Sequence, residues 1–288
     1  YHGFEADQTL QLAKWAGIAA LPVFLGGFLE DVTKNVTARD RLLLSFLSAT
    51  IAYFELEVGL YRINWPWFDG YILGVPGISL ILTVLMMGGL AHAANIIDGF
   101  NGLLLGVAIL AVIAFSIVGW KAGASLLIIY MMIMLGSLLG IMLINFPRGR
   151  IFLGDGGAYL IGFLLALFAL LLVKKFHLVS PWCPLLILIY PVVETLFSIY
   201  RKRVIRKKSA MAPDRLHLHM LVYRSLGARV GKALGIERNP ATSIVMWMIA
   251  LVPMIPAIVW WNQSIILVIC IAAFVVGYVT LYFRLLRR

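Results

Sequence analysis

The sequence predicts an all-α integral membrane protein that crosses the bilayer about nine times. Of its 288 residues, 62% are hydrophobic and only 13% are charged, which leaves too few polar side chains to cover the surface of a soluble protein. The apolar residues occur in runs of about 20, the length that a helix needs to span a hydrocarbon core. Because lipid cannot satisfy backbone hydrogen bonds, and because the runs are too continuous for barrel strands, we expect helices.

The nine apolar runs follow one another along the whole chain. They lie near residues 10–29, 41–60, 74–96, 102–120, 123–146, 158–174, 181–200, 242–261 and 264–285. Cys183 and Cys270 lie in different runs without a CxxC spacing, so neither a zinc site nor a redox pair is predicted. We therefore expect residues 1–288 to form a single transmembrane domain, in which residues 201–240 are a basic loop.

The distribution of lysine and arginine predicts which side of the membrane each loop faces. The loops after the first, third, fifth and seventh runs, together with the C-terminus, hold nineteen of the 24 basic residues, and the opposite loops hold four. By the positive-inside rule, the side with nineteen is the cytoplasm and Tyr1 lies outside. The rule also explains the net charge of +11, so we expect membrane lipids and no nucleic acid as partners.

Four polar clusters interrupt the apolar pattern, and each follows an odd-numbered run. All four are therefore expected on the cytoplasmic side, which predicts one composite site. The first cluster is the pair Glu30 and Asp31, directly after the first run. Taken alone, an adjacent acidic pair is more typical of a solvated loop than of a metal site.

The second cluster is HAANIIDGFNGL at residues 92–103. On a helix, Asn95 and Asp98 are three residues apart and share a face with His92. The two glycines that follow allow the backbone to break and to approach a ligand closely. Polar groups at the end of a membrane helix are costly without a function or a partner, so a binding site is predicted here, with a polar turn as the alternative.

The third cluster is NFPRGRIFLGDGGAYLIG at residues 145–162. Pro147 ends one helix, and three glycines surround a single carboxylate, Asp155. The glycines leave room for a bulky anionic ligand, and backbone N–H groups at the start of the next helix are expected to face phosphate oxygens. A tight interhelical turn is the alternative, and a P-loop is excluded because GxxxxGK[ST] is absent.

The fourth cluster is PDRLHLH at residues 213–219, in the most basic loop. In an extended segment, His217 and His219 would lie on one side and could serve a metal, a phosphate or a proton. A zinc site would need further ligands, and HExxH and CxxC are both absent. Glu194, near the end of the seventh run, is expected to form a structural ion pair, with Arg201 as one candidate partner, or else to face the site.

In chain order, these clusters resemble the motifs of the polyprenyl-phosphate N-acetylhexosamine-1-phosphate transferases, a superfamily that includes the pentapeptide transferase of peptidoglycan synthesis. The family's acidic pair resembles Glu30 and Asp31. Its N-x-x-D-G-x-D/N-G-L motif is similar to Asn95, Asp98, Gly99, Asn101, Gly102 and Leu103. Its F-x-G-D-x-G motif resembles Phe152, Gly154, Asp155 and Gly157, after Asn145 and Pro147, and its D-R-x-H-x-H-H motif resembles Asp214, Arg215, His217 and His219.

Three features depart from the family pattern. Glu30 stands where the family has its first aspartate, and Met220 stands where it has its last histidine. The sugar-transferring branch usually has two further spans, which the resemblance places before Tyr1. A longer carboxylate keeps the charge of the acidic pair, whereas a methionine removes one phosphate-binding group.

The resemblance implies transfer of N-acetylhexosamine-1-phosphate from a cytoplasmic UDP-sugar to polyprenyl (undecaprenyl) phosphate, giving UMP and a polyprenyl-diphosphate sugar that initiates a cell-surface glycan. It implies a bacterial inner-membrane location, an active site on the cytoplasmic side, an apolar groove for the lipid tail, and a homodimer as one option. Two anionic phosphates must approach each other, so Mg²⁺, with Mn²⁺ as an alternative, is the expected cofactor.

The resemblance also implies a role for each cluster. Asp98 and Asp155, with Asn95, are expected to contact the metal. Glu30 and Asp31 are expected at the lipid phosphate, where a carboxylate takes the acceptor's proton. The catalytic candidates are thus Glu30, Asp31, Asp98 and Asp155, and the substrate-binding candidates are Asn95, Asn101, Asn145, Arg215, His217 and His219.

Three other functions stay open. A phospho-N-acetylmuramoyl-pentapeptide transferase would use the same chemistry, although the DRLHLH motif and the two spans after it favour the sugar-only branch. A catalytically inactive scaffold would have the same fold. A transporter is disfavoured, because it would place its polar groups near the midplane of the membrane and show internal repeats.

Overall fold

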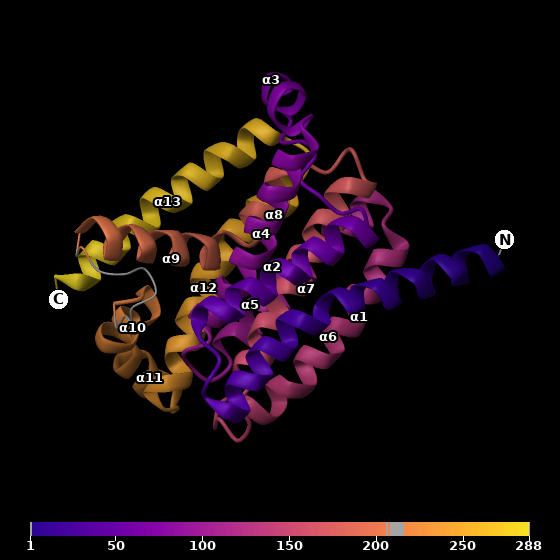
Figure 1. The fold of residues 1–288 in the computed structure, drawn as a ribbon. Helices are drawn as coiled ribbons and strands as arrows, with labels where there is room; N and C mark the ends of the chain where they lie inside the picture. Colours follow the sequence, from indigo (N-terminus) through magenta and orange to yellow (C-terminus); the bar gives the residue numbers. More distant parts are fainter. Residues whose placement is uncertain (1, 206, 208–215, 288) are drawn as a thin grey trace.

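Figure 1 shows the computed structural model, which describes residues 2–205, 207 and 216–287. Every regular element within these ranges is a helix. Seven of the helices are long and apolar enough to cross a membrane, namely α1 (His2–Thr33), α4 (Pro76–Ile97), α5 (Leu103–Ala122), α6 (Ser125–Asn145), α7 (Gly154–Lys175), α12 (Arg238–Val259) and α13 (Ser264–Leu286). The prediction of an all-α polytopic membrane protein is confirmed.

The second predicted span is shorter than expected. Of the run at 41–60, only the part in α2 (Ala38–Glu55) is helical. This helix has 18 residues, and four of them are charged, so it lacks the length and composition of the seven others. It begins at a capping box, in which the Thr37 hydroxyl accepts the N–H of Asp40 and the Asp40 carboxylate accepts the N–H of Thr37. The start of α2 is thereby defined to the residue.

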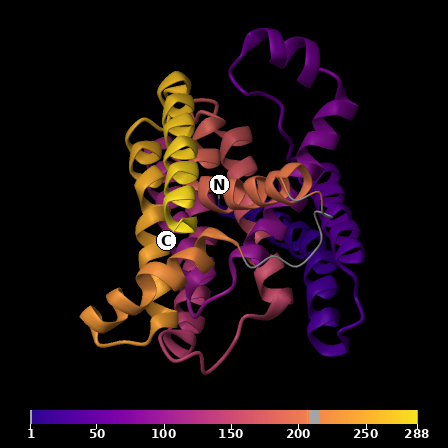
Figure 2. The same ribbon diagram turned by 90° about the vertical axis from the view of Figure 1, so that its left-hand side faces the viewer.

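The seventh predicted span, at 181–200, is divided into α8 (Trp182–Ile187) and α9 (Ile189–Tyr200). Pro191 has no N–H to donate to the carbonyl of Ile187, so the helix breaks there. Figures 1 and 2 show that α9 runs across the long axis of α12 and does not continue along α8. The expectation of one continuous helix here is wrong, and the count of nine spans is not confirmed.

Short helical segments complete the described part of the chain. They are α3 (Pro66–Phe68) and η1 (Asp69–Leu73) between α2 and α4, η2 (Arg201–Ile205) after α9, and α10 (Leu218–Val222), η3 (Tyr223–Gly227) and α11 (Ala228–Leu234) before α12. Asp214 and Arg215 lie outside the described residues. The basic loop predicted at 201–240 thus contains several short helices, and α12 begins inside it.

Helix α7 lies at the centre of the bundle, with α1, α4 and α5 packed against it. Lipid gives little hydrophobic driving force for helix association, so membrane helices pack through small residues that allow their backbones to come close. Gly162 of α7 shows this, because a Cβ there would lie 2.7 Å from the carbonyl oxygen of Leu90 in α4. The end of α1, the end of α4 and the starts of α2, α7 and α12 lie at one end of this bundle (Figure 1).

Candidate active site

The acidic pair at the end of α1 lies against the start of α7. Both oxygens of the Asp31 carboxylate accept backbone N–H groups, with Asp155 N 2.9 Å from Oδ1 and Gly156 N 3.0 Å from Oδ2. These amides belong to the first turn of α7, where N–H groups have no partner within the helix. Asp31 therefore caps α7 from a distant part of the chain. The expectation that these two amides face phosphate oxygens is wrong, because the Asp31 carboxylate already accepts their hydrogen bonds.

Glycines allow α1 and α7 to come this close. A Cβ on Gly27 would lie 2.5 Å from the backbone nitrogen of Gly156. Gly154 has a φ of +72°, a conformation that favours glycine, and a Cβ there would lie 2.5 Å from Oδ2 of Asp31. The contact between Asp31 and α7 therefore depends on the absence of side chains at these positions.

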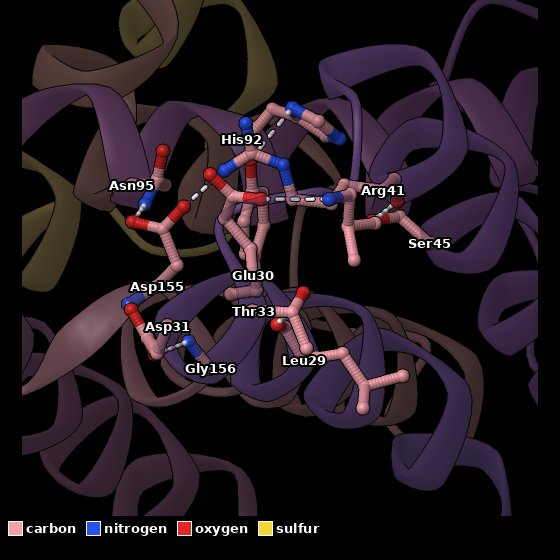
Figure 3. A network of polar contacts seen from close by, with 12 residues as sticks. Leu29, Glu30, Asp31, Thr33, Arg41, Ser45, His92, Asn95, Asp155 and Gly156 are labelled. Atoms are coloured by element: carbon pink, nitrogen blue, oxygen red, sulfur yellow. Dashed lines mark hydrogen bonds and ion pairs between the residues drawn. The ribbon is translucent and has the colours of Figure 1, made fainter.

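The side chain of Asp155 is the point at which groups from α2 and α4 meet α7 (Figure 3). Its Oδ1 accepts a hydrogen bond from Nδ2 of Asn95 at 2.9 Å, and its Oδ2 is paired with the guanidinium of Arg41. Three of the predicted site residues, Asp31, Asn95 and Asp155, are thus brought together. Arg41 was missed by sequence reasoning, which counted it only among the basic residues of a cytoplasmic loop.

His92 and Tyr159 lie beside this pair. Nδ1 of His92 is 3.4 Å from the Tyr159 hydroxyl, and the two rings meet edge to face with their centres 4.7 Å apart. The guanidinium of Arg41 lies 5.8 Å from the centre of the Tyr159 ring. Nε2 of His92 is buried and has no hydrogen-bond partner among the described residues. The site therefore holds a cation and an imidazole next to Asp155.

Asp98 directly follows the last residue of α4. Burial, and then the negative charge of Asp155, raise the pKa of Asp98 from 3.8 to about 7. The two carboxyl groups therefore repel each other, and a cation between them would relieve the repulsion. Together with the amide oxygen of Asn95, they offer the oxygen ligands that Mg²⁺ prefers. In the part of the chain that the structure describes, no group of three His, Cys, Asp or Glu side chains forms a ready metal cage.

Glu30, Asn101 and Asn145 take part in local contacts near the site. Oε2 of Glu30 accepts the N–H of Val36 at 2.9 Å, which closes the turn between α1 and α2. Nδ2 of Asn101 donates to the carbonyl of Pro147 at 2.9 Å. Asn145 is buried, and its Nδ2 donates to the carbonyl of Ile151 at 2.6 Å. These contacts shape the turns around Asp155, and contact of these side chains with a substrate stays a prediction.

His217 and His219 lie at the start of α10 with stacked rings, whose centres are 5.3 Å apart at an angle of 6°. They therefore share one side, as expected, although His219 lies inside a helix and not in an extended segment. His219 is buried against the second cluster, with Nε2 3.2 Å from the place that a Cβ on Gly99 would take. Burial lowers the pKa of His219 to about 4, so the ring is neutral.

An apolar cavity of about 520 Å³ lies between α2, α4, α7, α8 and α9. At one end its lining includes Leu42, which follows Arg41, and Ala93, which follows His92. Leu85 and Leu196 also line it, and both are exposed on the outer surface of the bundle. The cavity therefore runs from helix positions adjacent in sequence to Arg41 and His92 out to the surface that faces lipid.

Fold and site together define the class of protein, which is a helical membrane protein with a polar site at one end of the bundle beside an apolar cavity. The site gathers carboxylates, an amide, a guanidinium and imidazoles. Residues 15–173, more than half of the chain, match the sequence profile of glycosyl transferase family 4. The chain belongs to this family. The matched segment contains the first three polar clusters and ends before the histidine motif.

Individual relatives agree with this assignment. Over 139 residues the chain is 34% identical to a Bacillus subtilis protein named "Probable undecaprenyl-phosphate N-acetylglucosaminyl 1-phosphate transferase", covering 48% of this chain and 38% of that one. It is 29% identical over 214 residues to the undecaprenyl-phosphate alpha-N-acetylglucosaminyl 1-phosphate transferase of Salmonella typhi. This match covers 72% of the present chain and 57% of the relative. It is 27% identical over 201 residues to the phospho-N-acetylmuramoyl-pentapeptide-transferase of Streptococcus pyogenes. This match covers 67% of the present chain and 58% of the relative. The chain thus spans less than two thirds of the length of these relatives.

Proposed function

We propose that the protein transfers an N-acetylhexosamine-1-phosphate group from a UDP-sugar to undecaprenyl phosphate or a related polyprenyl phosphate. The convergence of Asn95, Arg41 and the cap Asp31 on Asp155 carries this proposal, because it assembles cationic and oxygen groups suited to two phosphates. This convergence lies within the segment that matches the family. The names of the Bacillus and Salmonella relatives support undecaprenyl phosphate as the acceptor and an N-acetylhexosamine-1-phosphate as the transferred group.

The proposed reaction is an in-line displacement at phosphorus. An oxygen of the lipid phosphate forms a bond to the phosphorus that carries the sugar, and the bond from that phosphorus to the bridging oxygen breaks. UMP leaves with the bridging oxygen and the electron pair of the broken bond. A lipid phosphate is already ionised near neutral pH, so the chain needs to neutralise and align charge more than to remove a proton.

The residues present suit these tasks. Arg41 offers two donors in a planar fork to a phosphate, and Asp155 is its partner when no phosphate is bound. Asp98 and Asp155, with Asn95, would hold a magnesium ion, whose remaining positions would go to water and phosphate oxygens. That ion would neutralise the diphosphate and stabilise the leaving oxygen. Asp31 accepts hydrogen bonds from the backbone amides of Asp155 and Gly156, which supports a role in positioning Asp155.

The acceptor's tail would lie in the cavity between α2, α4, α7, α8 and α9. Its lining is almost wholly apolar and includes Leu42 and Ala93, the sequence neighbours of Arg41 and His92, so a phosphate at the polar site and a hydrocarbon chain in the cavity fit one molecule. The basic residues of the sequence support a cytoplasmic position for this end of the bundle. The bacterial inner membrane is then the proposed location, because polyprenyl phosphate and UDP-sugars meet there.

The proposal is tested with membranes that contain the protein. They are incubated with undecaprenyl phosphate, Mg²⁺ and a panel of UDP-sugars that includes UDP-N-acetylglucosamine, UDP-N-acetylgalactosamine and UDP-N-acetylmuramoyl-pentapeptide. We expect UMP and a lipid-linked sugar from one UDP-N-acetylhexosamine, and no product from membranes with the Asp155→Asn variant. Absence of product with every donor would contradict the proposal and favour an inactive scaffold.

A second candidate is transfer of phospho-N-acetylmuramoyl-pentapeptide. It is favoured by one observation, the 27% identity to the Streptococcus pyogenes transferase over 201 residues. Product from UDP-N-acetylmuramoyl-pentapeptide alone in the same panel would select this function. Both candidates predict the same chemistry at phosphorus, so the donor panel separates them and a metal requirement does not.

A further inference from the structure

Glu194 in α9 is a completely buried carboxylate outside the Asp155 cluster, with an exposed fraction of 0%. Oε1 lies 2.9 Å from Nδ1 of His217 and accepts the N–H of Leu218 at 3.1 Å. Oε2 accepts the hydroxyl of Tyr278 in α13 at 2.9 Å and also lies 3.2 Å from the N–H of Leu218. One carboxylate thus connects α9, the start of α10 and α13.

These contacts determine how the imidazole of His217 is presented. An ionised carboxylate only accepts hydrogen bonds, so the Nδ1 atom that faces Glu194 carries the proton. Nε2, on the other side of the ring, is then left to bind a ligand, as an acceptor when the ring is neutral and as a donor when it is charged. The His217 side chain keeps 11% of its surface exposed, whereas Glu194 keeps none.

The His217 ring also has a defined place relative to the polar site. It stacks on His219, and His219 lies against Gly99 and meets the ring of Phe100 edge to face at 5.7 Å. Gly99 directly follows Asp98, a proposed metal ligand. The hydrogen bond from His217 to Glu194 therefore orients an imidazole within a packed stack that ends at the second polar cluster.

We propose that Glu194 is a positioning residue of the donor site, which holds Nδ1–H of His217 so that Nε2 faces a phosphate of the UDP-sugar. The inference rests on the proposed function, since it assigns the histidine motif to the donor. Burying a carboxylate is costly, and a joint between α9 and α13 alone could be made by apolar side chains. A hydrogen-bonded carboxylate behind an imidazole is a common way to set its tautomer and direction.

The test compares Glu194→Gln, His217→Ala and the double variant with the wild-type protein in membranes. Glutamine keeps the volume and one acceptor for Leu218, but it loses the charge that holds Nδ1–H. We expect Glu194→Gln to raise the KM for the UDP-sugar by about 10- to 100-fold, the loss of one charge-assisted hydrogen bond. The KM for polyprenyl phosphate should stay unchanged, and the double variant should bind donor no worse than His217→Ala alone.

Tyr278→Phe is the matched control, because it removes a hydrogen bond to the same carboxylate without touching His217. Its donor KM should stay within about twofold of the wild type, since the charge on Glu194 remains. If Glu194→Gln lowers thermal stability and kcat but leaves the donor KM unchanged, Glu194 is only a structural joint. Losses that add in the double variant would also overturn the proposal.

Equilibrium binding of UMP to the purified wild-type, Glu194→Gln and Tyr278→Phe proteins separates this inference from the proposed function. Weaker UMP binding by Glu194→Gln alone would support the inference even if no donor of the panel is turned over, a result that would count against the proposed function. Equal UMP binding by all three proteins, or none by the wild type, would overturn the inference, whatever the transferase assay shows.

Discussion

Asp31 and Glu194 are two carboxylates that each hold the start of a helix from a distant part of the chain. Asp31 accepts the N–H groups of Asp155 and Gly156 in α7, and Glu194 accepts the N–H of Leu218 in α10. Asp31 is half-buried at the end of the bundle, whereas Glu194 is completely buried and also accepts two side-chain donors.

The difference concerns what replaces the carboxylate when it is removed. Water can reach the end of the bundle, so the amides of α7 would regain part of their hydrogen bonding without Asp31. Water cannot easily reach the pocket of Glu194, so its donors would be left unpaired. The half-buried carboxylate should therefore matter more for the geometry of the site, and the buried one more for the stability of the protein.

The largest effect is expected at the residue that Asp31 positions. Asp155→Asn and Asp98→Asn should each lower transferase turnover by about 1,000-fold or more, because both carboxylates would hold one cation and its phosphate. The double variant should lose little more than either single variant, as expected for groups that act as a unit. Losses that multiply, or full activity in excess EDTA, would contradict a shared metal ion.

Alanine variants of the two capping carboxylates compare them directly. Glu194→Ala should destabilise the protein by about 3–5 kcal/mol, because three buried donors lose the charged acceptor that they share. Asp31→Ala should cost about 1–2 kcal/mol, the usual range for the loss of a helix cap, and should lower turnover more than that loss explains. Unfolding in detergent micelles measures both costs, and a larger cost for Asp31→Ala would reverse the comparison.

Two glycines of α1 show whether close contact with α7 is needed for the cap. Gly27→Ala places a methyl group 2.5 Å from the backbone of Gly156, so α1 must move away and Asp31 must lose hydrogen bonds. We expect a destabilisation of about 1–3 kcal/mol, typical of overpacking, together with reduced turnover. Gly17→Ala in the same helix is the control, since nothing lies within 4 Å of its Cβ. Equal effects of the two changes would show that the contact is unimportant.

The last expected effect is on the pH dependence of stability, through the titration of Asp98. Its pKa of about 7 in the folded protein exceeds the ordinary 3.8, so the fold favours the protonated form. The stability contributed by this proton is fully present below about pH 3.8 and is lost as pH rises through 7. With metal removed by EDTA, the melting temperature should fall between pH 5 and pH 8, and Asp98→Asn should flatten that slope. If the slope is the same in Asp98→Asn, the raised pKa does not belong to Asp98.

Much of the arrangement was predictable because polar residues are rare in such an apolar chain. Glu30, Asp31, Asn95 and Asp155 stand out against the apolar runs, and their common place at one end follows from helices that alternate in direction. The break at Leu188 also had a signal in Pro191, but a run of 20 apolar residues outweighed it. Pro191 therefore predicted the helix break better than the length of the apolar run predicted a continuous helix.

Other parts of the site had no signal in the sequence. Arg41 occurs among bases that the positive-inside rule already explains, so nothing marked it as a partner of Asp155. The contact between Glu194 and Tyr278 joins residues 84 positions apart, and a tyrosine in an apolar run is ordinary. Likewise, no sequence pattern indicated that Asp31 accepts hydrogen bonds from two backbone amides of α7. Such contacts depend on how helices pack, which periodicity and composition do not determine.

The cavity beside α9 has a consequence for kinetics. Leu196 and Leu85 line it and also face the hydrocarbon, so a lipid that enters there arrives by diffusion in the plane of the bilayer. The concentration that governs its capture is then a mole fraction in the membrane, not an amount per volume of solution. Adding inert phospholipid at a fixed amount of acceptor would dilute the substrate and slow the reaction, although nothing in the aqueous phase had changed.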